Sequence, residues 1–591
     1  MSHTPPDRNK PAKRGTRNSL SCAQCRYKHL RCDGRKPVCS RCATNTVPCV
    51  YPVSRRRGNP KPGNSSLSPV RAVYENPIDS SLQIPTISSS SSAATNGEIE
   101  LSSDSASSFL SLYYEFFHAA HPCALPFQVF KTRLNEPKIQ PLLRVMCYIG
   151  SIFDISCQPQ LIESCAQRAR DSVAEIRSLI RPFTPFDVQA LLLYSIAVYW
   201  CNKTESGVEL LDEAIRMAVA LGMNKKEFAS TNAEVDAVLE ESWRRTWWVI
   251  YITDAHIAGM LAIIITQVTY LMTAGSTHTY PFRTSGIEIT TDFPCEEEQY
   301  ETGAIPPPRS IEDYENREFL GEDEASFSSY AELIGLTMGI DRALSPGNTA
   351  DYRIYTTMAA SADTSVRAWH SLLSPKRRQL IRRDGSFDEV MFKAFFIMHT
   401  YTVEIHRPLS ALSHSAIESV SRCAPLAPSE QLKCNSVQER DLHTFKCTQA
   451  INSIDDLLTL PTNMKNHSPF IICMIANVTI AHLSACRFIF SGDQRVKSRE
   501  KIRLTMGTLK RLSEHWSLGK RTYREIGIIA RELLSLTKDP PASLGAVDRP
   551  LPDPKSPALP PLDMLPNSDF DFCAFFDADA PGLTEAGSFM L

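Results

Sequence analysis

The sequence predicts a small six-cysteine module followed by a large all-α domain, with a disordered linker between them and disordered tails at both ends. Three observations predict this class. Six cysteines lie within 28 residues near the N-terminus, helical periodicity dominates residues 109–538, and Ser- and Pro-rich stretches flank that region. A chain of 591 residues is also too long for one ordinary core, which favours about two to four domains.

Basic charge is concentrated near the N-terminus, although the whole chain carries a formal net charge of -2. Residues 1–61 contain fifteen Lys and Arg against two Asp, whereas the last thirty residues contain six acids and no bases. Such a basic segment favours binding to a polyanion. The N-terminal residues 1–21 are basic, are predicted to be disordered and lack the apolar run of a secretory signal. We therefore expect an intracellular protein with reduced cysteines.

The six N-terminal cysteines follow the spacing C-x2-C-x6-C-x6-C-x2-C-x6-C. Each C-x2-C pair can place two thiolates on one tetrahedral zinc, which takes four such ligands. Two separate zinc ions would need about eight ligands, but six sulfurs are enough if two of them bridge. The sequence therefore predicts two zinc ions bound by Cys22, Cys25, Cys32, Cys39, Cys42 and Cys49.

Two other interpretations fit this spacing less well. Unrelated buried thiols would not repeat the same intervals in both halves of the segment. A cross-brace module of the RING or LIM type uses more ligands at other spacings, and the nearest further candidate, His29, lies on a predicted helix.

Residues 22–49 resemble the fungal Zn2Cys6 binuclear cluster family in this spacing and in the basic stretch from Arg26 to Arg31. Pro37, two residues before the fourth cysteine, also matches the family pattern. The resemblance implies a nuclear protein that binds double-stranded DNA. It also implies three cysteine pairs: Cys22 and Cys39 bridge both zinc ions, Cys25 and Cys32 complete one site, and Cys42 and Cys49 complete the other.

A short helix over residues 23–30 is predicted to enter the major groove while the metal holds it, because so short a helix does not form alone. The resemblance places Lys28 and His29 at the base edges of a CGG-like triplet, and Lys suits the O6 and N7 acceptors of guanine. The other basic side chains are expected at phosphates, where they raise affinity without reading sequence: Arg26, Arg31, Arg35, Lys36 and Arg41.

Residues 50–108 are predicted to form a linker that is first basic and then rich in Ser and Pro. The basic runs at 10–14 and 55–57 suit nuclear import, DNA-backbone contacts, or both. Apolar heptads of a coiled coil are missing from the linker sequence. A monomer on one triplet and a homodimer held by the large domain therefore both stay open.

The helical region, residues 109–538, contains a predicted hairpin and a longer helix. The hairpin comprises Asp187–Trp200 and Ser206–Leu221, with Gly222 as the C-terminal cap. The longer helix, Ala233–Ala258, should carry i,i+4 ion pairs and bury two tryptophans: Glu240 with Arg244, Glu241 with Arg245, and Trp243 with Trp247.

Residues 241–248 and 406–408 resemble the fungal-specific regulatory domain that follows many zinc clusters, which implies an all-α domain that restrains or transmits activation. Residues 287–294 match an acidic, proline-containing segment of that family, but residues 262–280 intervene where relatives continue directly. We interpret 262–280 as a retained intron, with an inserted buried helix as the alternative. Residues 257–275 have the length of a membrane span, yet they contain Gln267 and several Thr, so no membrane association is expected.

The tail, residues 539–591, is proline-rich and then alternates acids with aromatics between Asp569 and Asp577. This composition predicts a disordered activation segment that binds transcriptional coactivators. A solvated tail, or one that docks on its own domain, is the alternative.

An enzyme is not expected, because the sequence contains no P-loop, H-E-x-x-H, G-x-S-x-G or G-x-G-x-x-G motif. The twelve other cysteines lack paired ligand spacing and are expected to be buried. Residues and resemblance together predict a sequence-specific RNA polymerase II transcription factor that activates a fungal gene set, with a secondary-metabolite cluster preferred. The alternatives are a repressor, a regulator of nutrient catabolism and, least favoured, an α-helical enzyme with a zinc module.

Overall fold

The computed structural model describes residues 32, 35, 39–44, 103–178, 180–269, 283–321, 325–344, 351–382, 384–424, 432 and 436–535. They fall in two units, Met1–Ala93 and Ala94–Leu591. In the first unit the described residues include one short helix, α2 (Ser40–Thr44). The predicted recognition helix, most of the linker and the tail lie outside the described residues.

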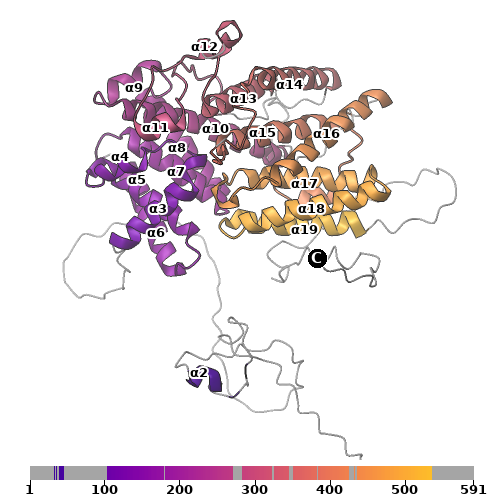
Figure 1. The fold of residues 1–591 in the computed structure, drawn as a ribbon, viewed down its shortest axis with the longest axis horizontal. Helices are drawn as coiled ribbons and strands as arrows, with labels where there is room; N and C mark the ends of the chain where they lie inside the picture. The colour runs from indigo at the N-terminus through magenta and orange to yellow at the C-terminus, as the bar shows by residue number, and fades with distance from the viewer. Residues whose placement is uncertain are drawn as a thin grey trace, which may run out of the picture. The chain divides into compact units, whose positions relative to one another are not determined.

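The second unit is a large all-α domain, as the sequence predicts (Figure 1). Its described residues contain no strand, only two isolated β-bridges, Phe293 to Arg309 and Ile381 to Phe387. Its first part comprises α3 (Ser103–Phe116), η1 (His118–Ala120), α4 (Phe127–Thr132), η2 (Pro137–Ile139), α5 (Gln140–Phe153), α6 (Pro159–Arg177), α7 (Pro185–Trp200), α8 (Thr204–Leu221), α9 (Lys226–Asn232), α10 (Ala237–Thr269), α11 (Glu297–Thr302), α12 (Ile311–Glu315) and η3 (Arg317–Phe319).

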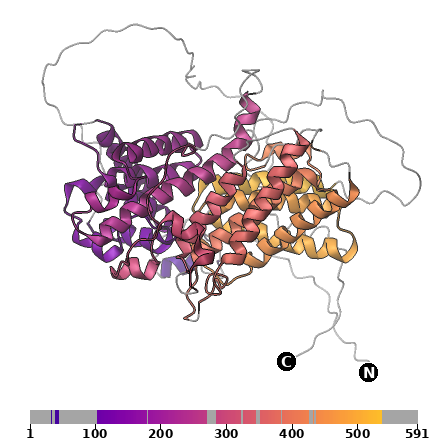
Figure 2. The same cartoon turned by 90° about the horizontal axis from the view of Figure 1, so that it is seen from above.

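The remaining helices form the other side of the same domain, and the first of them adjoins α10 of the first part (Figures 1 and 2). They are α13 (Ser329–Leu344), α14 (Tyr352–Leu372), α15 (Glu389–His406), η4 (Arg407–Leu409), η5 (Ala416–Val420), α16 (Val437–Leu458), η7 (Met464–Asn466), α17 (Ile471–Phe488), α18 (Gly492–Leu512) and α19 (Ser517–Ser535).

Two helices, α7 and α17, are buried along nearly their whole length. A helix that is apolar on all sides belongs in the core of a large domain, because no face of it favours water. The rings of Trp200, at the end of α7, and Phe470, just before α17, pack edge to face with centroids 5.4 Å apart. One hydrophobic core therefore extends from one side of the domain to the other.

Among the described residues one helix, α17, has the length and mean hydropathy, 1.6, of a candidate membrane span. Within the fold 89% of that window is buried, as expected for a core helix.

The hairpin predicted around residues 187–221 is present as α7 and α8. Helix α7 begins earlier than predicted, at Pro185, because Thr184 and Asp187 form a reciprocal capping box and proline suits the first helical position. Helix α8 ends at Gly222, whose φ of +87° gives the left-handed cap expected of that glycine.

Helix α10 differs from the prediction at both ends. It begins at Ala237 rather than Ala233, because Glu234 and Val235 have positive φ angles of 53° and 64° and the Asp236 side chain accepts hydrogen bonds from the first turn. It continues to Thr269, so its backbone covers the first part of the proposed insertion 262–280.

Helix α3 begins at Ser103, inside the segment predicted to be linker. Its first turn is polar, whereas Phe109, Leu110 and Tyr113 are buried against the rest of the domain. The apolar residues that hold α3 in place thus come after its start, which is why composition alone sets the linker boundary too late.

Candidate metal centre and nucleic-acid interface

The described part of the N-terminal unit places two of the six predicted zinc ligands on one helical turn. The backbone carbonyl of Cys39 accepts a hydrogen bond from the Ala43 amide at 3.0 Å, so Cys39 occupies the N-cap position of α2 and Cys42 the third position inside it. Residues three apart lie on the same side of a helical turn, so these two positions are neighbours. The local helix therefore gives the second C-x2-C pair the geometry to share one metal.

Burial and chemistry of these thiols fit the predicted zinc. Cys39 is 0% and Cys42 1% exposed, although α2 has only five residues, and Cys32 is half-buried. Thiolates are the usual ligands of structural zinc, and two sulfurs on one turn supply half of a tetrahedral set. Bound zinc would cross-link a segment that is too short to hold a hydrophobic core.

The other predicted site residues are distributed as follows. Arg35 is exposed, as a phosphate-contacting side chain must be, and Arg41 lies on α2. The remaining predicted ligands and DNA contacts lie outside the described residues: Cys22, Cys25, Arg26, Lys28, His29, Arg31, Lys36 and Cys49.

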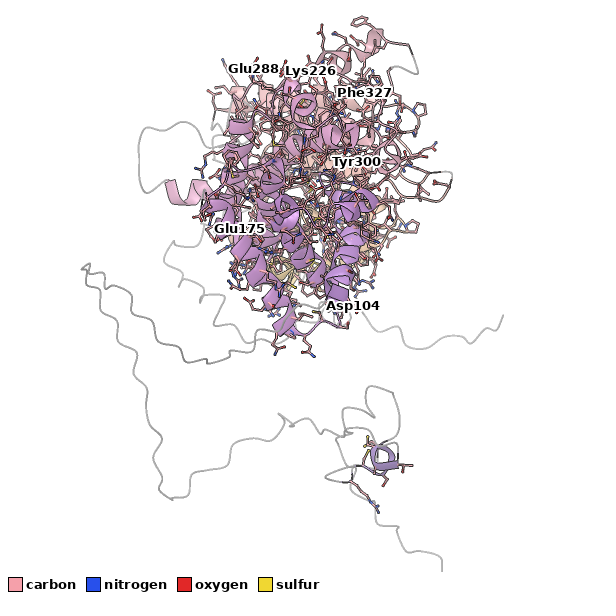
Figure 3. All side chains as sticks on the ribbon, turned by 90° about the vertical axis from the view of Figure 1, so that its left-hand side faces the viewer. Asp104, Glu175, Lys226, Glu288, Tyr300 and Phe327 are labelled. Atoms are coloured by element: carbon pink, nitrogen blue, oxygen red, sulfur yellow. The ribbon has the colours of Figure 1, made fainter. Side chains whose placement is uncertain are left out.

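In the helical domain, the segment 241–248 forms the structural centre of α10. Arg245 is 0% exposed and donates to Glu241 at 2.8 Å, to Glu297 at 2.5 Å and to the Cys295 carbonyl at 3.1 Å. Its guanidinium also lies 4.0 Å from the ring centroid of Tyr300, which is buried inside the domain (Figure 3). The predicted i,i+4 pairs with Glu240 and Glu241 are confirmed, and Arg245 in addition ties α10 to α11.

The opposite polar edge of the same segment fixes the turn before α4. Ser242 donates to the Cys123 carbonyl at 2.7 Å, and Gln189 of α7 donates to the same carbonyl at 2.8 Å. Gln189 also donates to Thr246 at 2.8 Å. The Gln189 amide nitrogen and the Ser242 and Thr246 hydroxyls thereby find partners inside the core, where an unpaired polar group would cost about 1–3 kcal/mol.

Residues 287–294, which match the acidic, proline-containing segment of the family, return to α10. The indole of Trp248 donates to the Asp292 carbonyl at 2.9 Å and stacks on Phe293 with ring centroids 5.3 Å apart. Just before this segment, the Thr284 amide donates to the buried Asp254 carboxylate at 2.8 Å. The chain therefore rejoins α10 at Asp254 after the proposed insertion.

Residues 406–408 lie where α15 passes into η4, and His406 and Arg407 are also buried. His406 contacts Asp363 of α14 at 2.9 Å and His443 of α16 at 2.8 Å, while Arg407 donates to Glu418 at 2.8 Å. Both family-like segments thus connect helices to one another. Their chemistry is that of a scaffold.

The scattered cysteines behave largely as predicted. Cys147 and Cys473 are buried, and burial raises the pKa of the Cys147 thiol to about 12, which keeps it protonated and unreactive. Cys201 is half-buried and accepts a hydrogen bond from the Tyr148 hydroxyl at 3.6 Å. The candidate residues missed at the sequence level are His118, Glu297 and Glu301, which come together only in the fold.

Comparison with known proteins gives two matching family models. The fungal Zn(2)-Cys(6) binuclear cluster domain matches residues 20–58, which include α2, and the fungal specific transcription factor domain matches residues 107–316. The second match covers most of the first part of the helical domain, including the Arg245 scaffold. No solved structure gives a significant match.

Individual relatives agree with these models. The C6 finger domain transcription factor iacK of Pestalotiopsis fici is 26% identical over 595 residues, covering 89% of this chain and 82% of that protein. The Zn(2)-C6 fungal-type transcription factor FTF1c of Fusarium oxysporum f. sp. lycopersici is 43% identical over 54 residues, 9% of this chain and 6% of that protein. An uncharacterized transcriptional regulatory protein of Schizosaccharomyces pombe is 36% identical over 76 residues, 12% of this chain and 11% of that protein. With its zinc-cluster domain, the helical domain behind it and a C6 finger relative that is similar over most of both chains, the chain belongs to the fungal Zn(2)-C6 transcription factor family.

Proposed function

We propose that this family member is a nuclear, sequence-specific RNA polymerase II transcription factor that activates a fungal gene set. The observation that carries the proposal is the pair of buried thiols, Cys39 and Cys42, on one helical turn inside the zinc-cluster match. Two zinc ions are held by the six cysteines, with Cys22 and Cys39 as bridges. The module folds only with its metal, so DNA binding depends on zinc.

The proposed DNA contacts divide by role. Lys28 and His29 lie at the base edges of a CGG-like triplet, and the five arginine and lysine side chains assigned to phosphates supply affinity. His29 is the unusual member, because a neutral imidazole offers one donor where a lysine offers a permanent charge. Protonation of His29 adds a charge near DNA, so binding strengthens as the pH falls through the histidine pKa.

A binding assay separates these roles. The full chain is titrated onto duplexes with and without the CGG triplet, and Lys28→Ala is compared with Lys10→Ala, which lies outside the cluster. Loss of a good base contact costs about 1–3 kcal/mol, so Lys28→Ala should weaken binding to the CGG duplex roughly tenfold or more and reduce the preference for it over the other duplex. Lys10→Ala should weaken binding to both duplexes by the same factor. If Lys28→Ala also weakens binding to both duplexes by the same factor, the assignment of Lys28 to bases is refuted.

The pH dependence attributed to His29 is tested by a separate variant. Affinity of the wild type and of His29→Lys for the CGG duplex is measured at two pH values on either side of the histidine pKa. The wild type should change with pH and the lysine variant should change less. The same pH response in both would remove His29 from the interface.

Activation is assigned to the tail, because acids alternate with aromatic residues between Asp569 and Asp577. Residues 562–591 fused to a foreign DNA-binding domain should activate a reporter through coactivators. Replacing the aromatic residues of this stretch by alanine should abolish that activity while keeping the charge. A fusion that does not activate the reporter would favour the repressor alternative.

The gene set is proposed to be a secondary-metabolite cluster, and genome-wide binding of the tagged protein identifies it directly. The same material tests nuclear localisation, and cross-linking of the bound complex tests the homodimer. Binding sites confined to nutrient-use genes would replace the cluster assignment.

A further inference from the structure

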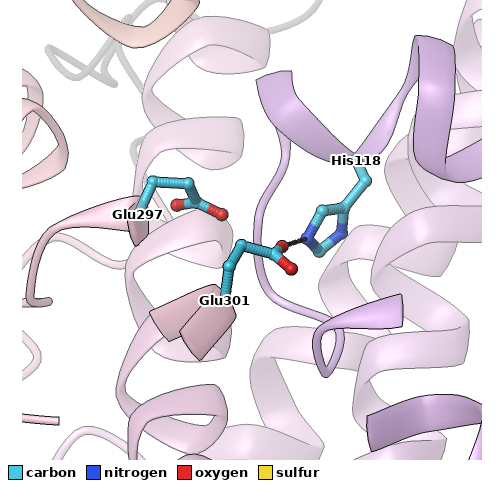
Figure 4. Close-up of side chains that lie close together, drawn as sticks. All are labelled: His118, Glu297 and Glu301. Carbon is cyan, nitrogen blue, oxygen red and sulfur yellow. Dashed lines mark ion pairs between the residues drawn. The ribbon is translucent and has the colours of Figure 1, made fainter. Parts of the chain in front are cut away.

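His118 of η1 is a buried imidazole whose polar atoms are left without hydrogen bonds. The residue is 4% exposed, and neither ring nitrogen has a hydrogen-bond partner among the residues that the structure describes. Its Nε2 lies 3.7 Å from a carboxylate oxygen of Glu301 (Figure 4). Buried polar groups are normally satisfied, so this side chain points to a partner that the described residues do not supply.

Two carboxylates on α11 face this imidazole. Glu297 and Glu301 are four residues apart, so they lie on the same side of one helical turn. One ligand atom from each of the three side chains lies within 4.8 Å of the others. Figure 4 shows both carboxylates directed toward the His118 ring.

The short helix that carries the carboxylates is firmly held. A capping box between Glu296 and Gln299 fixes its start, and Gly303, at a φ of +73°, fixes its end. Between the two carboxylates, the buried Tyr300 hydroxyl donates to the Ala124 carbonyl at 3.0 Å. Glu297 and Glu301 are therefore preorganised, whereas the outer part of Glu301, with 43% of its side chain exposed, is able to adjust.

The charges around this group are unbalanced. Glu297 also accepts from Arg245, but Arg244 and Arg245 already pair with three carboxylates, those of Glu240, Glu241 and Glu297. Glu301 adds a fourth carboxylate beside Glu297. A divalent cation would offset the excess negative charge.

The three side chains also line a cavity of about 330 Å³. Tyr330 contributes to the same wall, and its buried hydroxyl has no hydrogen-bond partner within the described part of the domain. A metal held by one nitrogen and two carboxylates would have further coordination positions, for which this cavity leaves room. Space for water or a small oxygen-donor ligand is therefore present beside the three side chains.

We propose that His118, Glu297 and Glu301 form a divalent metal site, suited to Zn²⁺ or Mn²⁺, that opens onto this cavity in the helical domain. One imidazole and two carboxylates match the ligand preferences of these ions, unlike the thiolates of the N-terminal module. The bound ion ties η1 to α11, and α11 is attached to α10 through Arg245. The site is independent of the zinc cluster.

Metal content of the full chain tests the proposal. The dialysed wild type should retain one zinc beyond those of the cysteine module, and His118→Ala and Glu301→Gln should each lose that equivalent. Glu298→Gln is the matched control, because Glu298 is exposed on the same helix outside the cluster, and it should retain the metal. Far-UV circular dichroism establishes that each variant is folded, and the conservative, partly exposed Glu301→Gln carries the comparison where His118→Ala does not fold.

A second probe separates the two metal sites. Mn²⁺ prefers oxygen and nitrogen ligands over thiolates, so its titration by electron paramagnetic resonance reports the histidine site even where the cysteine module holds no zinc. One Mn²⁺ per chain is expected, displaced by Zn²⁺ and lost in Glu301→Gln. A wild type that binds neither additional Zn²⁺ nor Mn²⁺, or a Glu301→Gln variant that binds them as the wild type does, overturns the proposal.

Discussion

Replacing Arg245 by methionine removes the cation at the centre of α10 and leaves two carboxylates facing a buried space. Breaking a buried ion pair by removing one partner costs about 3–5 kcal/mol, because the remaining charge stays desolvated. Glu241 keeps a contact with Arg244 at 3.1 Å and a hydrogen bond from the Cys295 amide at 2.9 Å. We therefore expect Arg245→Met to lower the free energy of unfolding by about 3 kcal/mol, the lower end of that range.

The loss should also depend on pH. In the wild type, burial acts to raise the pKa of Glu241, but Arg245 and then Arg244 outweigh it and the pKa is lowered. Its carboxylate therefore stabilises the fold above the unfolded pKa, and that stability is lost as the pH falls through the folded value. In Arg245→Met the effect of burial on Glu241 dominates, so the pKa of Glu241 is higher in the folded than in the unfolded state. Stability is then lost as the pH rises. The difference between the two proteins should be smaller at about pH 4 than at about pH 7.

Urea unfolding followed by circular dichroism at both pH values measures this loss. Arg170→Met is the control: Arg170 pairs with Glu163 at 2.5 Å on the surface, where such pairs contribute about 0–1 kcal/mol. If Arg245→Met is no more destabilising than Arg170→Met, or loses more stability at acid pH than at neutral pH, the role of Arg245 as the buried centre of the domain is refuted.

Three further predictions concern the same domain. Gly150→Ala in α5 should destabilise by about 1–3 kcal/mol, because the new methyl overlaps the Phe109 backbone carbonyl, whereas Gly507→Ala in α18 meets open space and should stabilise by about 0.5–1 kcal/mol; urea midpoints that shift in the same direction would contradict this. Burial lowers the pKa of Lys393 to about 7, so the charged lysine costs stability in the folded state. Lys393→Met should therefore raise the free energy of unfolding by a few kcal/mol below about pH 7, and this gain should shrink as the pH rises toward about 10. A pH-independent gain would show that the lysine is not desolvated. Deletion of residues 262–280 should leave a folded, helical protein, because the chain already rejoins Asp254 beyond this segment; a spliced transcript that encodes the segment, together with unfolding of the deletion variant, would instead make it an inserted structural helix.

The sequence was most informative where one short segment carries the whole signal. The cysteine spacing predicts ligands within 28 residues, and the structure adds that Cys39 and Cys42 meet on one turn. Periodicity likewise predicts α8, since its apolar positions recur locally. Where ends were misplaced, as at Ala237, the deciding feature was a pair of positive φ angles at Glu234 and Val235, which no hydrophobic pattern encodes.

The residues that sequence reasoning missed belong to contacts between distant segments. Glu297 and Glu301 have i,i+4 spacing, but that pattern usually marks a solvated helix face. His118 lies far earlier in the chain, and only the packing of η1 beside α11 brings its ring to those carboxylates. Long-range placement of this kind depends on the whole core and cannot be read from either segment alone.

Zinc dependence of DNA binding tests the central claim most directly. Affinity of the full chain for a CGG-containing duplex is measured as purified, after chelation and after zinc is restored, alongside Cys39→Ser and the buried core variant Cys147→Ser. We predict that binding is lost on chelation and in Cys39→Ser, returns with zinc, and persists in Cys147→Ser. Specific binding that survives both chelation and Cys39→Ser would contradict a zinc-held DNA reader.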